Sequence, residues 1–261
     1  MLDITKVKAL LIDLDGTLYF KGNQIPKANE TIEKLRALNI DLRFITSIDS
    51  KPVDAIHKKL RSLRFDISLN EIFSPNVAAL KFFESQPNST CYCLVSDRLM
   101  PNFLELNWNY DSPDYVIIGD FEDKVSSKEL NKVFNFIMRG AKILSLNSGR
   151  FYHSHQGMKI NTGSFVSLFE YATNQTSTVL GKPSESFMNL AISDMGLKAS
   201  EVAVVGDDIS SDILGAINVG AYGILVKTGE YNEFTVINSG ITPDLIIDSI
   251  ANLPYLFSHK K

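Results

Sequence analysis

The chain has 261 residues, of which 44% are hydrophobic and 21% charged, a balance typical of an ordinary globular protein rather than a disordered or fibrous one. Its formal net charge of −4 at pH 7 gives no electrostatic reason to expect nucleic acid or an anionic membrane as a partner. No apolar run reaches the ~18 residues of a membrane span, and the N-terminus, where acidic residues flank a short apolar stretch, does not fit a signal peptide. We therefore expect a cytoplasmic protein.

Short apolar runs recur along the chain and end in polar or small residues. Runs this apolar, without a clean alternation of polar and apolar residues, are typical of strands covered on both faces in a parallel α/β sheet. The expected strands of this kind are 9–13, 41–46, 201–208, 220–227 and 243–248.

Helical spacing separates these expected strands. Apolar residues recur every three or four positions in 29–40 and again in 183–197. Pro183 suits the first turn of the second helix, and Gly196 suits its end. The alternation of strand and helix predicts a doubly wound α/β core with a parallel, Rossmann-like sheet.

One interval is too long for a simple crossover. The distance in sequence from Thr46 to Lys182 far exceeds the ~30 residues of a strand-helix-strand unit. We therefore predict a core formed by 1–82 and 178–261, with a second α/β domain, 83–177, inserted as a cap. The cap has its own expected strands, 90–96, 113–119 and 141–147, and its own expected helices, 126–140 and 162–172.

The two cysteines of the chain fall in the first expected strand of the cap. Cys91 and Cys93 point to the same face if this segment is a strand, and they are too close in sequence for a normal structural disulfide. We interpret them as small core residues, which argues against a disulfide-built secreted protein.

Polar side chains gather where the core strands end. In an open parallel sheet, ligands bind beyond the carboxyl ends of the strands, so polar residues at several such ends are expected to converge. The residues in question are Asp13 and Asp15, Thr46, Asp207 and Asp208 with the preceding Gly206, and Lys182 just before a helix.

Phosphoryl transfer is the chemistry that this set favours. A carboxylate can attack phosphorus to give an aspartyl-phosphate, which splits a difficult hydrolysis into two easier steps. The attack brings two anions together, at a cost of about 4 kcal/mol per unit pair at ~4 Å and an effective dielectric of ~20. Mg²⁺ removes this cost and prefers one or two carboxylates together with phosphate and water oxygens.

Each residue of the set then has a role. Asp13 and Asp207 can supply the carboxylates for the metal, and Lys182 can neutralise a phosphate oxygen. The Thr46 hydroxyl can donate to another phosphate oxygen. Asp15 can protonate the leaving oxygen and later deprotonate the attacking water, with crowding by the other acids raising the apparent pKa of the cluster.

Each signal alone has an ordinary structural explanation. Asp-x-Asp-Gly-Thr and Gly-Asp-Asp both occur as simple turns. The run "GKPS" is not a nucleotide-triphosphatase loop, because Thr176 stands where that loop needs a glycine. The order of the four signals, each at a strand end or a helix start, is what favours a common site.

Four motifs carry a resemblance to a known family. "DLDGT", "FITS", "GKPS" and "VGDDISSDILGA" resemble, in order, the motifs of the haloacid-dehalogenase-like (HAD) superfamily. The long insertion resembles a type II cap. The stretches "LRFDISLNEIF", "YATNQTSTVLGKP" and "ILVKTGEY" resemble the subgroup of the HAD-like hydrolase domain-containing proteins and the phospholysine phosphohistidine inorganic pyrophosphate phosphatases. The likeness spans about 6–233.

The resemblance implies roles for the matching positions. Asp13 matches the nucleophile and a metal ligand, and Asp15 matches the general acid/base, whose backbone carbonyl also binds the metal. Asp207 matches the metal-binding acid of the fourth motif. Asp212 matches a later acid of the same motif, which contacts the residues that bind the metal rather than the metal itself, and Asp208 can share this role.

The second and third motifs supply the expected phosphate contacts. Thr46 matches the phosphate-binding hydroxyl, and Lys182 matches the lysine. The next residue of the second motif is often Asn in this subgroup and is Ser47 here, which keeps a backbone N–H for phosphate but loses an amide side chain. This departure bears on substrate preference more than on catalysis.

The cap is expected to select the substrate, because the core site is generic. The stretch 145–165 is expected to face the site as a hairpin-like run followed by a helix start at 161–163. Asn147 and Arg150 are candidates for substrate contact or for a solvated loop. His153 and His155 form an H-x-H pair that we interpret as exposed hairpin residues rather than metal ligands. Asp97 and Arg98 are expected to form a structural ion pair.

The sequence thus predicts a Mg²⁺-dependent phosphatase that hydrolyses a small phosphorylated molecule through an aspartyl-phosphate. A phosphotransferase or phosphomutase with the same intermediate is the alternative within catalysis. A catalytically weak protein that binds a phosphate ligand is the alternative outside it, with Ser47 as its only support. The oligomeric state stays open, and contact between the apolar strands of two caps would give a homodimer.

Overall fold

The computed structural model describes residues 3–121, 126–154 and 157–258. Contacts within the chain divide it into two compact units. Unit 1 consists of Met1–Thr46, Asp54–Phe73 and Lys182–Lys261, and unit 2 consists of Ser47–Val53 and Ser74–Gly181. The assignment of 83–177 as an inserted cap remains a prediction.

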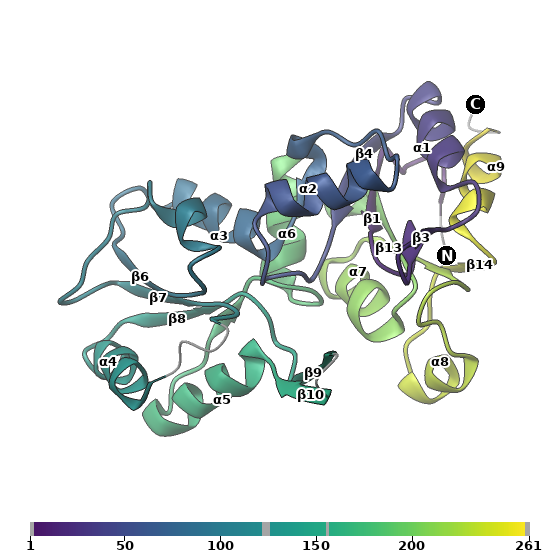
Figure 1. The fold of residues 1–261 in the computed structure, drawn as a ribbon. Coiled ribbons are helices and arrows are strands. Elements are labelled where there is room, and N and C mark those ends of the chain that lie inside the picture. The colour runs from purple at the N-terminus through teal and green to yellow at the C-terminus, as the bar shows by residue number, and fades with distance from the viewer. Residues whose placement is uncertain (1–2, 122–125, 155–156, 259–261) are drawn as a thin grey trace. The chain divides into compact units, whose positions relative to one another are not determined.

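Unit 1 contains a six-stranded parallel sheet, as the sequence predicts (Figure 1). The strand order is β14-β13-β12-β1-β4-β5. All five residues of β1 and all five of β12 are buried, which explains their continuous apolar sequence. The strands are β1 (Ala9–Asp13), β4 (Asp41–Ile45), β5 (Ile72–Phe73), β12 (Val202–Gly206), β13 (Tyr222–Val226) and β14 (Leu245–Ile247).

Helices follow these strands in the doubly wound manner. Helix α1 packs against α9 and α6 against α7, and Phe187 of α6 meets Phe73 of β5 edge to face at 5.3 Å between ring centroids. The helices are α1 (Ala28–Ala37), α2 (Val53–Ser62), α6 (Glu185–Asp194), α7 (Leu214–Val219), α8 (Glu233–Ser239) and α9 (Leu253–Phe257). A small hairpin joins β2 (Tyr19–Phe20) to β3 (Asn23–Gln24).

The start of α6 corrects one sequence expectation. The helix begins at Glu185, and the Ser184 hydroxyl caps it by accepting the backbone N–H of Phe187 at 3.2 Å. Pro183 therefore lies before the cap and not in the first turn, because a serine side chain satisfies the free N–H groups better than a proline can. Gly196, with φ of 68°, follows the end of the helix as predicted.

Unit 2 has its own parallel sheet, in the order β11-β8-β7-β6. Figure 1 shows α4 and α5 on one face of this sheet and α3 on the other. Alternate residues of β7 point to opposite faces of this sheet. Tyr115 contacts Phe83 of α3 on one face, and Val116 packs with Phe136 of α4 on the other. The elements are β6 (Cys91–Leu94), β7 (Tyr115–Ile118), β8 (Lys142–Ser145), β11 (Thr178–Val179), α3 (Pro75–Glu84), α4 (Ser127–Met138) and α5 (Thr162–Thr173). Cys91 and Cys93 are buried and not bridged, as expected.

The predicted hairpin of unit 2 is confirmed. Strands β9 (Phe151–Ser154) and β10 (Gly157–Ile160) pair antiparallel and are mostly exposed. Helix α5 follows at once, with Asn161 as its cap residue. His153 lies in β9, whereas His155 falls outside the described residues, so the pair cannot be placed as a whole.

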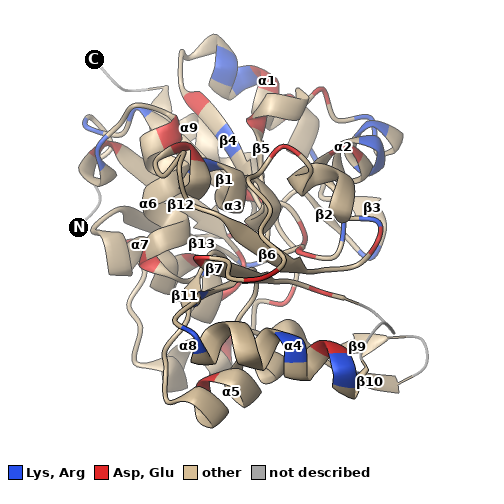
Figure 2. Ribbon diagram, turned by 90° about the vertical axis from the view of Figure 1, so that its left-hand side faces the viewer, with Lys and Arg blue, Asp and Glu red and all other residues tan. Residues whose placement is uncertain are grey.

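Charged residues lie mostly on helices and loops, with acidic and basic segments interspersed (Figure 2). Within 3–121, 126–154 and 157–258, no helix is both long and apolar enough to cross a membrane. In the part of the chain that the structure describes, the remaining helical elements are four single 3₁₀ turns, Leu69–Glu71, Met100–Phe103, Ala199–Glu201 and Ile250–Asn252, and one π-helical turn, Ile209–Ile213.

Candidate active site

The two carboxylates of "DLD" occupy different surroundings. Asp13 is the last residue of β1 and is buried, flanked by β4 on one side and β12 on the other. Asp15 comes after the strand, and its side chain is 54% exposed, with an oxygen 3.8 Å from the Lys59 ammonium. Gly16 turns the chain with φ of 99°, a conformation that favours glycine. One carboxylate is therefore held rigidly inside unit 1, and the other is accessible to solvent.

Three buried carboxylates meet at the carboxyl edge of the sheet, and we call them the acid cluster. They belong to Asp13, Asp207 and Asp212, each of which offers an oxygen within 4.8 Å of the others. Parallel pairing of β1 with β12 explains why Asp13 and Asp207 meet, since both residues stand where these strands end. Asp212 reaches the cluster from the π-helical turn that follows β12.

Lys182 joins this cluster from the start of the α6 region. Its buried ammonium lies 2.5 Å from Asp13 Oδ1 and 2.7 Å from Asp212 Oδ1. Burial alone would lower the pKa of Lys182, but the Asp13 and Asp212 carboxylates raise it above the ordinary lysine value. The lysine is therefore charged and fixes one oxygen of each acid.

Burial raises the pKa of all three acids. For Asp13 the rise is opposed by Lys182 and reinforced by the charges of Asp212 and Asp207. Burial also raises the pKa of Asp207 to about 6, while its backbone hydrogen bond with Glu230 works in the opposite direction. Burial raises the pKa of Asp212 as well, against the attraction of Lys182. The cluster thus has three carboxylates and one ammonium, so its negative charge is only partly neutralised.

This donor set fits a hard divalent cation. All three groups of the cluster are carboxylates, and oxygen ligands without imidazole or thiol are those that Mg²⁺ prefers. A cation would also stabilise the charged form of these acids, which burial disfavours most and the neighbouring carboxylates disfavour further. The residues present are therefore compatible with Mg²⁺.

Two glycines make room for the Asp207 carboxylate. A Cβ on Gly16 would lie 2.1 Å from Asp207 Oδ2, and a Cβ on Gly229 would lie 2.2 Å from the same atom. The same oxygen accepts the backbone N–H of Glu230 at 2.7 Å, and Thr17 Oγ1 lies 3.4 Å from Oδ1. Sequence reasoning did not single out Thr17, Gly229 or Glu230. The only signal for them was Gly229 itself, which comes soon after the expected strand 220–227, a strand that ends at the same edge of the sheet.

The remaining predicted residues lie around this cluster in different ways. Thr46 directly follows β4, the neighbour of β1, and is buried, with its N–H donating to the Phe73 carbonyl at 3.2 Å. Asp208 caps the π-helical turn by accepting the Ser210 N–H at 2.8 Å, and its own N–H donates to Asp212 Oδ2 at 3.2 Å. Asp208 therefore positions the turn that carries Asp212, whose carboxylate stands in the cluster itself.

Ser47 belongs to unit 2, where its carbonyl accepts the Asn147 side-chain amide at 3.2 Å. The same amide lies 3.4 Å from Asp49 Oδ1, and the Thr162 hydroxyl donates to Asp49 Oδ2 at 2.8 Å. Asp49 thus holds the loop after β8 and the start of α5. Sequence reasoning missed Asp49, because an acid in the loop "SIDSK" gives no sign that it will be buried.

We expect Asp49→Asn to alter how stability depends on pH. Burial raises the pKa of Asp49 to about 6, so the folded state binds the carboxyl proton of Asp49 more tightly than the unfolded state does. The resulting stabilisation is complete below the ordinary pKa of 3.8 and is lost as the pH rises through about 6. Asparagine does not ionise and so does not lose stability in this way. The free energy of unfolding of the variant, relative to that of the wild type, should therefore rise by about 1 kcal/mol between pH 5 and pH 7.5.

Urea unfolding of the wild type and Asp49→Asn at both pH values checks this prediction. The exposed acid Asp111, changed to asparagine, is the control within the same unit. A difference in the free energy of unfolding that is the same at pH 5 and pH 7.5 would contradict it.

Two families match the chain. The family described as "Haloacid dehalogenase-like hydrolase" matches residues 10–109, and the family described as "HAD-hydrolase-like" matches residues 179–253. The first match contains the end of β1, and the second contains Lys182, Asp207 and Asp212.

Relatives of known name and fold agree with these matches. Haloacid dehalogenase-like hydrolase domain-containing protein 2 of Bos taurus is 36% identical over 86% of this chain and 86% of its own length. The phospholysine phosphohistidine inorganic pyrophosphate phosphatase of Danio rerio is 32% identical over 95% of this chain and 93% of its own. Among solved structures, a p-nitrophenyl phosphatase from Archaeoglobus fulgidus aligns with a TM-score of 0.87 at 26% identity, covering 95% of this chain and 98% of that one.

A doubly wound parallel sheet with buried carboxylates and a lysine at its carboxyl edge is the scaffold of a phosphatase-type hydrolase. The chain belongs to the haloacid dehalogenase-like hydrolases, and it is an enzyme. The resemblance seen in the sequence motifs and the predicted fold class are both confirmed.

Proposed function

We propose that the chain is a Mg²⁺-dependent phosphatase that hydrolyses a small phosphorylated molecule through an aspartyl-phosphate on Asp13. The observation that carries this proposal is the pairing of a buried carboxylate at the end of β1 with Lys182, inside a cluster of three acids. Binding alone does not need a buried nucleophile aimed by a rigid strand, whereas covalent catalysis does. The Danio rerio relative and the Archaeoglobus fulgidus structure are both named as phosphatases, which supports the same class of activity for this chain.

Asp13 is the proposed nucleophile. Lys182 holds Oδ1, which directs the other oxygen of the carboxylate to the attack on phosphorus. The new bond joins this oxygen to phosphorus, and the bond from phosphorus to the leaving oxygen breaks. The Lys182 ammonium and the Thr46 hydroxyl stabilise the charge that spreads over the other phosphoryl oxygens.

Asp15 is the proposed general acid and base. Its exposed carboxyl group can give a proton to the leaving oxygen and can then take one from the water that attacks the aspartyl-phosphate. This second attack breaks the bond between Asp13 and phosphorus, releases inorganic phosphate and restores the Asp13 carboxylate. The Ser47 N–H is a further proposed donor to phosphate.

Asp13 and Asp207, together with the backbone carbonyl of Asp15, are the proposed ligands of Mg²⁺. When bound, the ion neutralises the repulsion between the phosphoryl group and the nucleophile. Asp212 is proposed to hold Lys182 in place beside this set, with Asp208 supporting the turn that carries it.

The substrate class rests on the relatives. The name of the zebrafish relative gives phospholysine, phosphohistidine and inorganic pyrophosphate, and the archaeal structure is of a p-nitrophenyl phosphatase. We take small phosphoesters, pyrophosphate and phosphoamino acids as the candidates. Residues 83–177 as a substrate-selecting cap, a homodimer through that cap, and a cytoplasmic location are retained as predictions.

Removal of the metal is the direct test. We expect phosphate release from 4-nitrophenyl phosphate to fall at least about 100-fold when EDTA removes divalent ions, and to return when Mg²⁺ is added back. A rate that EDTA does not change would contradict the proposal. Comparing phosphate release with transfer to added alcohols or sugars separates a phosphatase from a phosphotransferase.

A further inference from the structure

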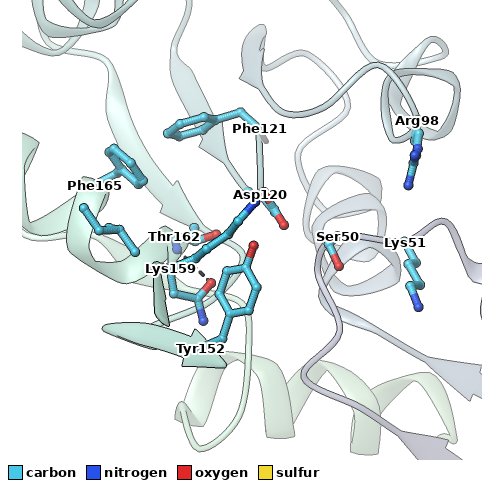
Figure 3. Close-up of a pocket in the computed structure, with 12 residues that line it drawn as sticks. Ser50, Lys51, Arg98, Asp120, Phe121, Tyr152, Lys159, Thr162 and Phe165 are labelled. Carbon is cyan, nitrogen blue, oxygen red and sulfur yellow. Dashed lines mark hydrogen bonds between the residues drawn. The ribbon is translucent and has the colours of Figure 1, made fainter. Parts of the chain in front are cut away.

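Unit 2 contains a pocket of its own, with a volume of about 580 Å³. This volume lies in the range of sites that hold small molecules. Figure 3 shows side chains from four separate parts of unit 2 around it. They include Ser50, Lys51, Arg98, Tyr152, Lys159 and Phe165.

The pocket has an excess of positive charge. Lys51, Arg98 and Lys159 line it together with a single acid, Asp120, so three bases face one acid among the lining residues. The first residues of α5 also belong to the lining, and the N-terminus of a helix of this length favours a negative charge. A cation would meet repulsion here, whereas an anion would be attracted.

Two of the three bases stand apart from the apolar side chains, whereas Lys159 lies beside Tyr152. In Figure 3, Lys51 and Arg98 stand on one side of the pocket with Ser50, and Phe121, Phe165 and Tyr152 stand on the other. Phe121 and Phe165 pack edge to face at 4.6 Å between ring centroids, which gives that side a fixed apolar wall. The lining therefore suits a molecule with a charged end and a flat apolar body.

Buried polar contacts hold the two sides in place. The bond from Thr162 to Asp49 ties the segment before Ser50 to the start of α5. The Asn76 side chain is buried and donates to the Lys51 carbonyl at 2.9 Å, which fixes the backbone of that residue. A lining fixed in advance loses little conformational freedom when a ligand binds.

We propose that this pocket binds a small aromatic anion, with its negative group toward Lys51 and Arg98 and its ring against Tyr152 and Phe165. The proposal goes beyond the phosphatase reaction and does not depend on it. We take this anion to be a molecule separate from the phosphorylated substrate.

Benzoate, an aromatic anion with a single charged end, is the probe for binding to the full chain, and its uncharged counterpart benzamide is the matched control ligand. We expect calorimetry to detect benzoate binding and to find benzamide at least about fivefold weaker. Lys51→Gln and Arg98→Gln should each weaken benzoate binding about fivefold, because each removes one charge from the lining. Lys128→Gln removes an exposed charge of α4, outside the pocket, and should leave the affinity unchanged.

The pocket assignment is overturned if benzoate does not bind, or if Lys51→Gln, Arg98→Gln and Lys128→Gln all bind it equally. The proposed phosphatase function is judged separately, by hydrolysis of 4-nitrophenyl phosphate and its dependence on Asp13. Either result can therefore fail without the other.

Discussion

Asp13→Asn is expected to lower kcat for phosphate release by about 10³-fold or more, because an amide oxygen cannot serve as the anionic nucleophile. Asparagine has almost the same shape as aspartate, so the strand end and the contact with Lys182 should persist. Steady-state release of inorganic phosphate from 4-nitrophenyl phosphate, with saturating Mg²⁺, measures the effect.

The control for this variant is its stability. The new asparagine keeps an oxygen that can accept a hydrogen bond from the Lys182 ammonium, and Asp212 keeps its charge beside that ammonium, so the melting temperature should show that the variant is still folded. Folded Asp13→Asn protein that keeps more than a tenth of the wild-type rate would exclude Asp13 as the nucleophile. Asp111→Asn, at an exposed position, should keep full activity.

Lys182→Met is expected to lower both activity and stability. The variant leaves Asp13 and Asp212 buried without their common cation, and breaking a buried ion pair of this kind costs about 3–5 kcal/mol. The loss of a donor to the phosphoryl group should lower kcat/KM by about 100-fold or more. Urea unfolding in EDTA and steady-state kinetics measure the two effects.

The stability cost of Lys182→Met should increase with pH. Without Lys182, burial and mutual repulsion raise the pKa of Asp13 and Asp212 further, so the folded state binds protons that the unfolded state releases. The stability of the variant is then highest below the ordinary pKa of 3.8 and falls as the pH rises through the raised values. The double variant Asp13→Asn/Lys182→Met should recover part of the loss at pH 8. A cost that does not change between pH 5 and pH 8 would contradict this account.

The residues that sequence reasoning located are those fixed by strand order. Asp13 and Asp207 stand at the ends of apolar runs, and the rule that parallel strands bring their carboxyl ends together was enough to predict that they meet. The same rule placed Thr46 beside them, after β4. Local periodicity also predicted the strands of unit 2 and the hairpin of β9 and β10, because their patterns depend on near neighbours.

The residues that it missed depend on distant contacts or on the backbone. Asp49 is buried only because Asn147 and Thr162, about a hundred residues later, fold against it. Glu230 acts on Asp207 through its N–H, which every residue other than proline possesses. The motifs do predict a supporting role for Asp212, but its position within the acid cluster depends on a π-helical turn, a rare structure that has no clear sequence pattern.

The position of β1 between β4 and β12 also determines when the acid cluster can form during synthesis of the chain. A nascent chain that has reached Gly181 contains all of unit 2, but it has neither β12 nor any of the three charged groups around Asp13, which are Lys182, Asp207 and Asp212. The strand that carries Asp13 then has its neighbour on one side only, and the other edge awaits residues made much later. A chain interrupted at Gly181 therefore lacks the acid cluster, which forms only after the last third of the protein has folded onto the first strand.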